Sequence, residues 1–285
     1  MSKLVEHSYG KSLIRLFKVT RHGDRDDLSD LTVGVRFEGD FDEAYIEGDN
    51  ERILPAESIR NTVHALAVDR PIDQVETFGL ALAGHFLAHH PQIALVRVEL
   101  AERRWERLPL GGREQGHAFA LGRRERRTAT ITHNGERASV VAGLDQLPLL
   151  KTAGARFEGY LADRFTDPAP SADRVLAADL TARWAYTHPD VTFGPFWQGV
   201  RLLLLETFAL HASESMQHTL YAMADAVLAS YEEIADVTLE MPTQEYRPVD
   251  LSRFGVENAG AVYLPSAEPD SLVSATVTRN NQVTS

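Results

Sequence analysis

The chain of 285 residues contains no cysteine. Disulfide bonds, thiolate metal sites and cysteine nucleophiles are therefore excluded together. The sequence also has no run of about 18 apolar residues, and residues 1–7 lack the apolar centre of a signal peptide. We therefore expect a soluble, cytoplasmic protein with no membrane partner, whose chemistry comes from other side chains.

Positive charge is scarce, since 29 Lys and Arg residues stand against 41 Asp and Glu residues, for a net charge of -12. A surface of this sign repels phosphate backbones. The one dense basic cluster, Arg-Arg-Glu-Arg-Arg at residues 123–127, has no aromatic residue among its arginines. We interpret it as the polar end of a strand and expect no nucleic-acid partner.

Two hydrophobic periods alternate along the chain. A period of two, typical of strands with one buried face, occurs at residues 31–37, 96–100, 176–186 and 237–241. Spacings of three and four predict helices at about residues 55–66, 72–89, 193–211 and 214–231. A last strand is expected at residues 272–278, and the prolines at 168 and 170 predict a loop over residues 167–171.

The order of strands, two helices and strands occurs twice, with a boundary near Gly143. This order predicts an α+β fold with one module at residues 1–143 and a second at residues 144–285. Each open sheet would have edges that need covering. We therefore expect the chain to form an oligomer.

Short motifs in a fixed order point to one family. They are Tyr9-Gly10-Lys11; Gly48-Asp49-Asn50 with Ser58-Ile59-Arg60-Asn61-Thr62; Gly116-His117-Ala118-Phe119; Leu150-Lys151-Thr152 with Phe157-Glu158-Gly159-Tyr160; Asp173-Arg174-Val175-Leu176; Met216-Gln217-His218-Thr219-Leu220-Tyr221; and Met241-Pro242. Together they resemble urate oxidase (uricase), a family with the tunnelling fold, over nearly the whole chain. The resemblance implies two tandem modules, each an antiparallel sheet with two helices, and a homotetramer whose sheets close into a barrel. It also implies cofactor-free oxidation of urate by dioxygen to 5-hydroxyisourate and hydrogen peroxide, at sites between subunits.

The resemblance assigns roles to particular residues. Phe157 would stack on the purine, Arg174 and Gln217 would bind its edge, and Met216 would supply a backbone contact. A guanidinium fork and a primary amide suit a flat anion with urea-like edges. Lys11 would be the catalytic base, which requires a neutral amine, and burial favours that form by lowering the pKa of an ammonium group.

The chain departs from the family pattern beside these residues. Ala56 stands where the family has the threonine that relays a proton with the lysine, and Glu57 follows it in place of an aspartate. After the last helix, the family's Asn-x-His reads Thr243-Gln244-Glu245. We keep Ala56 and Glu245 as catalytic positions and Glu57 and Thr243 as substrate-binding positions. The loop at residues 168–171 also lacks the leucine that the family places against the purine.

These departures lead to a hypothesis and an alternative. A carboxylate at Glu245 close to Lys11 would favour the ammonium form by raising the pKa of the lysine, and Ala56 has no hydroxyl to relay a proton. Urate turnover would then be strongly reduced. Alternatively, the chain binds another flat heterocycle, or uses Glu245 as a general base, without oxidising urate.

The same residues also have ordinary interpretations. Lys11 could be a solvated surface charge, Arg174 could form an exposed ion pair with Asp173, and Phe157 could belong to the core. His85 and His89 have the i, i+4 spacing of some zinc sites, but no recognised metalloprotease pattern accompanies them. No metal site is expected.

Overall fold

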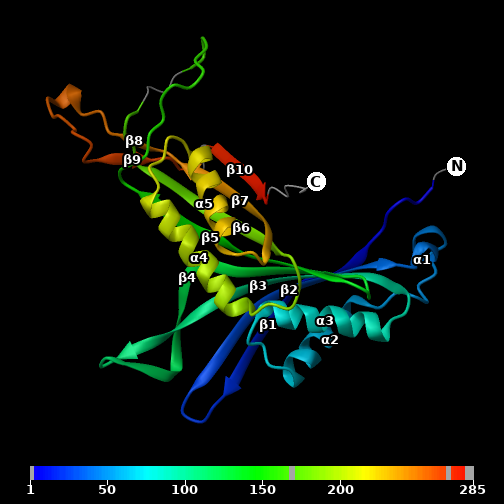
Figure 1. Cartoon of the computed structure of the whole chain (residues 1–285). Helices are drawn as coiled ribbons and strands as arrows, with labels where there is room; N and C mark the ends of the chain where they lie inside the picture. Colours follow the sequence, from blue (N-terminus) through cyan, green and yellow to red (C-terminus); the bar gives the residue numbers. More distant parts are fainter. Residues whose placement is uncertain (1–2, 167–170, 268–270, 280–285) are drawn as a thin grey trace. The chain divides into compact units, whose positions relative to one another are not determined.

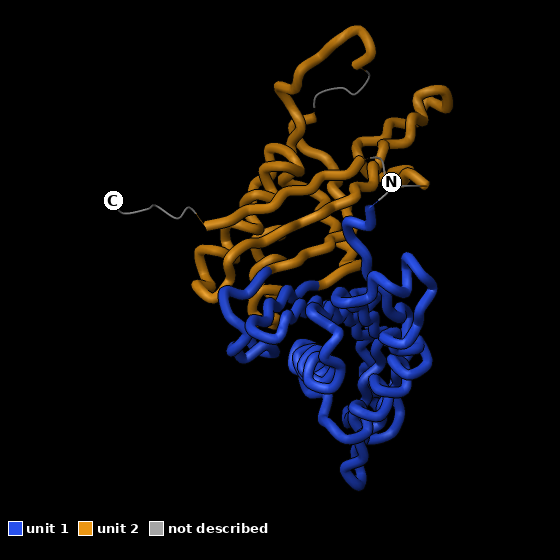
Figure 2. Tube along the Cα trace, turned by 90° about the vertical axis from the view of Figure 1, so that its right-hand side faces the viewer, with its two compact units in different colours: residues 1–143, 185–195 blue, residues 144–184, 196–285 orange. Residues whose placement is uncertain are grey.

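The computed structural model describes residues 3–166, 171–267 and 271–279. The chain divides into two compact units, coloured separately in Figure 2. The first runs to Gly143 and includes Ala185–Pro195, and the second holds Leu144–Trp184 and the chain from Phe196 onward. The sequence-based division into modules 1–143 and 144–285 remains a prediction.

The first unit is an antiparallel sheet with helices on one face (Figure 1). Its strands, in the order in which they pair, are β1 (Tyr9–Arg21), β2 (Asp26–Gly39), β3 (Ile93–Leu110) and β4 (Arg113–His133). The helices are α1 (Asp42–Ile46), α2 (Ala56–Asp69) and α3 (Val75–His89), of which α2 packs on β1 and α3 on β3 and β4. The alternation of Leu31, Val33, Val35 and Phe37 places all four side chains in the core.

The second unit repeats this plan. Its strands pair in the order β5 (Ala138–Lys151), β6 (Leu176–Tyr186), β7 (Ile234–Gln244) and β10 (Ser271–Thr278), and its helices are α4 (Phe193–Leu210) and α5 (Met216–Ser230). The first residues of β5 and α4 and the last two residues of β6 belong to the first unit. Helix α5 packs on β7 and β10. A short hairpin of β8 (Tyr246–Pro248) and β9 (Tyr263–Pro265) carries a single 3₁₀ turn, η1 (Ser252–Phe254), between its strands.

The predicted α+β class, the four longer helices and the strand at residues 272–278 are confirmed. Helix α1 and the β8–β9 hairpin had no sequence-based prediction, because both are too short to show a hydrophobic period. The proline loop at residues 167–171 lies outside the described residues, apart from Ser171.

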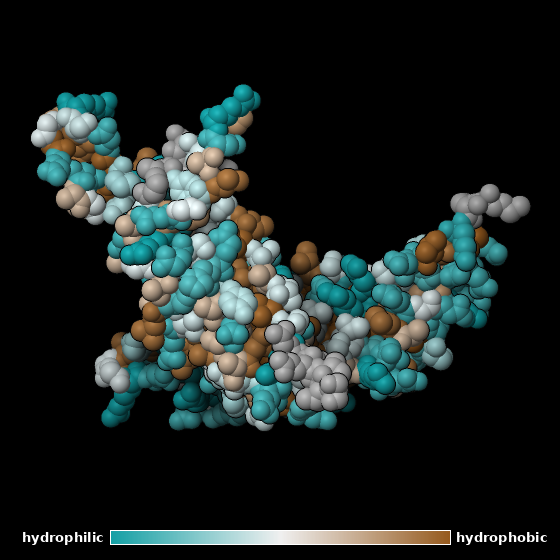
Figure 3. All heavy atoms as spheres, turned by 45° about the horizontal axis from the view of Figure 1, so that its top comes forward, coloured by the Kyte–Doolittle hydropathy of each residue, from teal (hydrophilic) through white to brown (hydrophobic). Residues whose placement is uncertain are grey.

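The structure describes no helix long and apolar enough to cross a membrane. The face seen in Figure 3 is mostly hydrophilic, with small hydrophobic patches.

The interpretation of residues 123–127 as a strand end is wrong. The cluster lies inside β4, where Glu125 and Arg127 are buried. Arg127 donates from Nε and Nη2 to the two carboxylate oxygens of Glu76 on α3, over 3.2 and 2.6 Å. Burial raises the pKa of Glu76, and the neighbouring Arg127 opposes that rise. Arg127 in this basic cluster therefore balances the charge of the buried Glu76 carboxylate.

We expect Glu76→Ala to lower the free energy of unfolding by about 3 to 5 kcal/mol, because it leaves the Arg127 guanidinium buried without its carboxylate. Chemical denaturation followed by circular dichroism measures the loss. Glu214→Gln is the matched control, since Glu214 and its partner Arg156 are more than half exposed, and it should cost less than about 1 kcal/mol. Equal losses in the two variants would contradict this account.

Candidate active site

One cavity of the second unit, of about 560 Å³, gathers side chains from four places in the sequence. They come from the loop before β6, the first turn of α5, the end of β7 with the following hairpin, and the start of β10. The residues predicted from the sequence that line it are Phe157, Arg174, Met216, Gln217, Thr243 and Glu245. Since these residues are widely separated in sequence, the fold, and not local spacing, brings them together.

Two isolated bridges hold the loop that carries Phe157. Ala155 pairs with Ser213 in parallel fashion, and Phe157 pairs with Ser171 in antiparallel fashion. The backbone N–H of Arg174 then donates to the carbonyl of Ala155 over 2.8 Å. The loop is therefore tied both to the chain just before α5 and to the segment that carries Arg174, which fixes three parts of the cavity wall relative to one another.

The guanidinium carbon of Arg174 lies 4.9 Å from the centroid of the Phe157 ring, a cation–π contact. Tyr160 also stacks on this ring, with centroids 4.9 Å apart and planes 18° apart. Arg174 is half-buried, and its Nε is buried with no hydrogen-bond partner among the described residues. Burial lowers the pKa of Arg174, and the negative charge of Glu245 partly offsets this. A buried donor without a partner is suited to an anionic ligand.

The alternative pairing of Arg174 with Asp173 is not seen. Asp173 instead accepts a hydrogen bond from the backbone N–H of Ala155 over 3.1 Å. This acid therefore supports the loop backbone and leaves the arginine to the cavity.

Helix α5 begins at Met216, as the sequence predicts for Gln217 at a helix start. Its N-cap is Ser215, whose side chain accepts from the backbone N–H of His218 over 3.1 Å. This cap fixes the first turn, in which Met216 is buried and Gln217 is exposed and lines the cavity. The amide of Gln217 is thus presented at the cavity wall by a rigid helix end.

The end of β7 brings two of the departures from the family pattern into the cavity. The Thr243 hydroxyl lies 2.6 Å from the Ser271 hydroxyl on β10. The Glu245 carboxylate accepts from Arg247 Nε over 2.8 Å and lies 2.7 Å from Arg247 Nη2. Arg247 was not identified from the sequence, although it stands two residues after Glu245, a spacing that puts both side chains on one side of an extended chain. The cavity therefore holds two arginines and one carboxylate.

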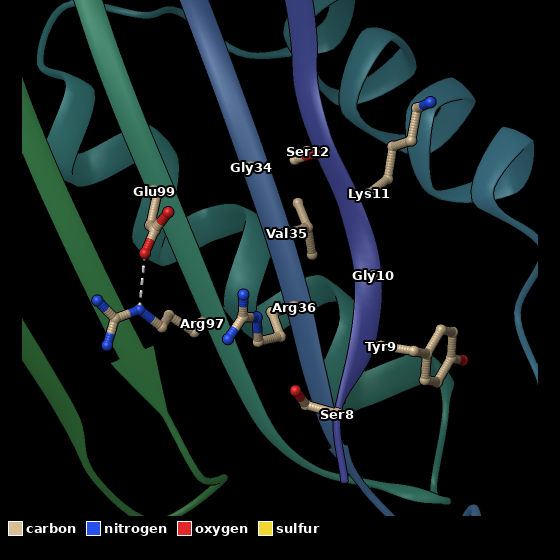
Figure 4. Close-up of a pocket in the computed structure, with 10 residues that line it drawn as sticks. All are labelled: Ser8, Tyr9, Gly10, Lys11, Ser12, Gly34, Val35, Arg36, Arg97 and Glu99. Atoms are coloured by element: carbon tan, nitrogen blue, oxygen red, sulfur yellow. Dashed lines mark hydrogen bonds and ion pairs between the residues drawn. The ribbon is translucent and has the colours of Figure 1, made fainter. Parts of the chain in front are cut away.

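The remaining predicted residues lie in the first unit. Lys11 is in β1, immediately before a bulge between Lys11 and Ile14 where Leu13 takes a left-handed conformation with φ of 55°. Such a conformation is strained for leucine, and bulges often turn a strand beside a functional residue. In Figure 4 the Lys11 ammonium points away from the charged groups of Arg36, Arg97 and Glu99.

Ala56 and Glu57 form the first turn of α2. The backbone N–H of Leu54 donates to the Tyr9 hydroxyl over 2.9 Å, so the chain entering α2 is fixed to the strand that carries Lys11. Glu57 forms an ion pair with Arg60 one turn later. The structure therefore places Lys11 and the Ala56 segment in one unit and the aromatic and arginine group in the other. Among the described residues, no group of three or more His, Asp or Glu side chains could hold a metal ion.

A family model described as Uricase matches residues 7–132 and 140–274. Similar proteins include the uricase of Arthrobacter globiformis, which is 34% identical over 97% of this chain and 90% of that protein. The uricase of Danio rerio is 32% identical over 97% of this chain and 95% of that protein, and that of Dictyostelium discoideum is 30% identical over 99% of both.

The fold is similar as well. The crystal structure of uricase from Arthrobacter globiformis has a TM-score of 0.94 at 34% identity, and the match covers 99% of this chain and 96% of that chain. A uricase structure from Bacillus fastidious, at 21% identity, shares the fold with a TM-score of 0.82. The agreement of the family model with relatives over nearly the full length shows that the chain belongs to the uricase family.

Proposed function

We propose that this protein oxidises urate with dioxygen and water to 5-hydroxyisourate and hydrogen peroxide, without a cofactor. Two electrons leave the purine and reduce dioxygen to the peroxide, and water supplies the new hydroxyl oxygen. The observation that carries the proposal is the half-buried Arg174 over Phe157, in a cavity of about 560 Å³, in a chain of the uricase family. The volume is ample for a bicyclic purine.

In this proposal the cavity binds the purine as an anion. Arg174 supplies the buried Nε–H that has no partner within the described chain, and the Gln217 amide supplies a neighbouring donor and acceptor. Phe157 supplies the stacking surface, and we expect the purine to replace Tyr160 against its ring. Met216 contributes its backbone at the start of α5.

We further propose a cytoplasmic homotetramer in which Lys11 of one subunit reaches the purine held by another. The open edge of the first sheet is β1, which exposes Leu13 and Phe17, and such an edge favours association with another copy. Lys11 would act as the base. Glu57, at the start of α2, would lie beside it.

The departures at Ala56, Thr243 and Glu245 act on proton transfer and on oxygen binding in this proposal. The comparisons give no support to a loss of activity or to a different reaction, so reduced turnover remains a prediction. The alternative use of Glu245 as a general base is not favoured either, because its carboxylate already faces the Arg247 guanidinium at hydrogen-bond distance.

Mixing the protein with urate and dioxygen should cause loss of urate absorbance, with one molecule of dioxygen consumed and one of peroxide formed for each urate. Turnover should be well below that of the Arthrobacter globiformis uricase assayed in parallel, because Ala56 lacks the relay hydroxyl. No oxidation at any urate concentration would contradict the proposed function. Equal rates would instead show that the three departures do not matter.

Restoring the family residues tests the cause of slow turnover. The triple variant Ala56→Thr, Thr243→Asn and Glu245→His should raise kcat by about a hundredfold, a typical contribution of positioned proton transfer. Glu245→Gln is the control, because it removes the charge and adds no imidazole. If the triple variant is folded, binds urate and remains as slow as the original protein, the explanation based on these positions is wrong.

Mixed assemblies test whether two copies share one site. Lys11→Met and Arg174→Met should each be inactive alone, and co-expression should restore part of the activity, since some sites would then combine a native Lys11 with a native Arg174. Assemblies of the double variant with either single variant are the control. Distinct affinity tags would show that mixed assemblies form, and mixed assemblies without activity would contradict a shared site.

A further inference from the structure

A second cavity, of about 300 Å³, lies in the first unit on strands β1, β2 and β3 (Figure 4). It is lined by Ser8, Tyr9, Gly10, Lys11, Ser12, Gly34, Val35, Arg36, Arg97 and Glu99. We propose that this cavity is a binding site for a small phosphate-type oxyanion, held between Arg36 and Arg97 and separate from the purine site.

The first support is the position of the two arginines. Arg36 on β2 and Arg97 on β3 are direct partners in the antiparallel register. Like charges opposite each other on neighbouring strands destabilise a sheet, because their side chains lie only about 5 Å apart. An anion between the two guanidinium groups would remove this repulsion and use donors from both.

The second support is that the local acid balances only part of this charge. Glu99 accepts from Arg97 Nε over 2.9 Å. Arg36 makes no hydrogen bond or ion pair within the described part of the chain, and its side chain is exposed. One guanidinium charge is therefore left over at this place, on a protein whose net charge is -12.

The third support is the open space beside the arginines. Gly10 on β1 pairs with Arg36, and a Cβ at Gly10 would lie 2.0 Å from the carbonyl oxygen of Val35, so only glycine fits. Gly34 lies in β2, two residues before Arg36 on the same face. The absence of a side chain at Gly34, where a Cβ would have no neighbouring atom nearer than 3.8 Å, leaves room for a ligand next to the guanidinium groups, and Ser8 and Ser12 also line the cavity.

The size and chemistry of the cavity limit the ligand. A volume of about 300 Å³ is at the small end of ligand pockets. Guanidinium groups match the oxygen spacing of phosphate with two parallel hydrogen bonds. Val35 and Val98, which adjoin the two arginines in their strands, are buried in the core, so the exposed Arg36 and Arg97 side chains lie on the opposite face of the sheet. The Lys11 ammonium points away from these two guanidinium groups (Figure 4). Lys11 also lines the cavity, but the two guanidinium groups proposed to hold the oxyanion are not among the groups proposed to act on urate.

Isothermal titration calorimetry with inorganic phosphate, at constant ionic strength and without urate, tests the proposal. The protein should bind one phosphate per chain with a dissociation constant in the millimolar range or below. Arg36→Gln and Arg97→Gln should each weaken binding about tenfold or more, because each removes a charge-assisted hydrogen-bond donor. Glu99→Gln should strengthen binding, because it frees Arg97 and removes a negative charge.

A control variant separates this site from other positive groups. Arg183→Gln removes an exposed strand arginine that lines neither cavity, and it should leave phosphate binding unchanged. Circular dichroism checks that each variant is folded. Absence of phosphate binding to the original protein, or equal binding by folded Arg36→Gln, would overturn the proposal. Neither result would bear on urate oxidation.

Discussion

The candidate site depends on a guanidinium group held against an aromatic ring without a full set of hydrogen-bond partners. Arg174 lies over Phe157, and its Nε is buried and unpartnered within the described chain. Desolvation of a charged donor is costly unless a ligand or partner satisfies it. The two isolated bridges hold the backbone of the loop that carries Phe157, and the backbone N–H of Arg174 donates to the Ala155 carbonyl, so both residues start from fixed backbone positions.

The contacts of Glu245 change the expected effect of this departure on the charge of the cavity. Glu245 faces Arg247, so the added negative charge in the cavity arrives with an added positive one. The cavity lining therefore keeps a surplus of positive charge, which suits the urate anion that we propose binds there. Ala56, at the start of α2, supplies no hydroxyl, and we predict that proton relay is the step this departure slows.

Much of the fold could be predicted from hydrophobic periods, because Leu31 to Phe37 and the α5 stripe bury one face each. The position of Gln217 at a helix start also followed from sequence. Other features could not be predicted in this way. The pairing of Arg127 with Glu76 joins residues 51 apart, and the β8–β9 hairpin and the Leu13 bulge depend on tertiary contacts. Site residues were found through motifs, since no local pattern joins Phe157 to Thr243.

Urate binding in the absence of dioxygen tests the central claim most directly, because it separates recognition of the purine from its oxidation. The account predicts that the anaerobic protein binds urate, and that Arg174→Gln weakens binding about tenfold or more through the lost charged donor. Arg183→Gln should bind urate as the original protein does. Urate binding that is absent, or that is the same in folded Arg174→Gln, would contradict the account.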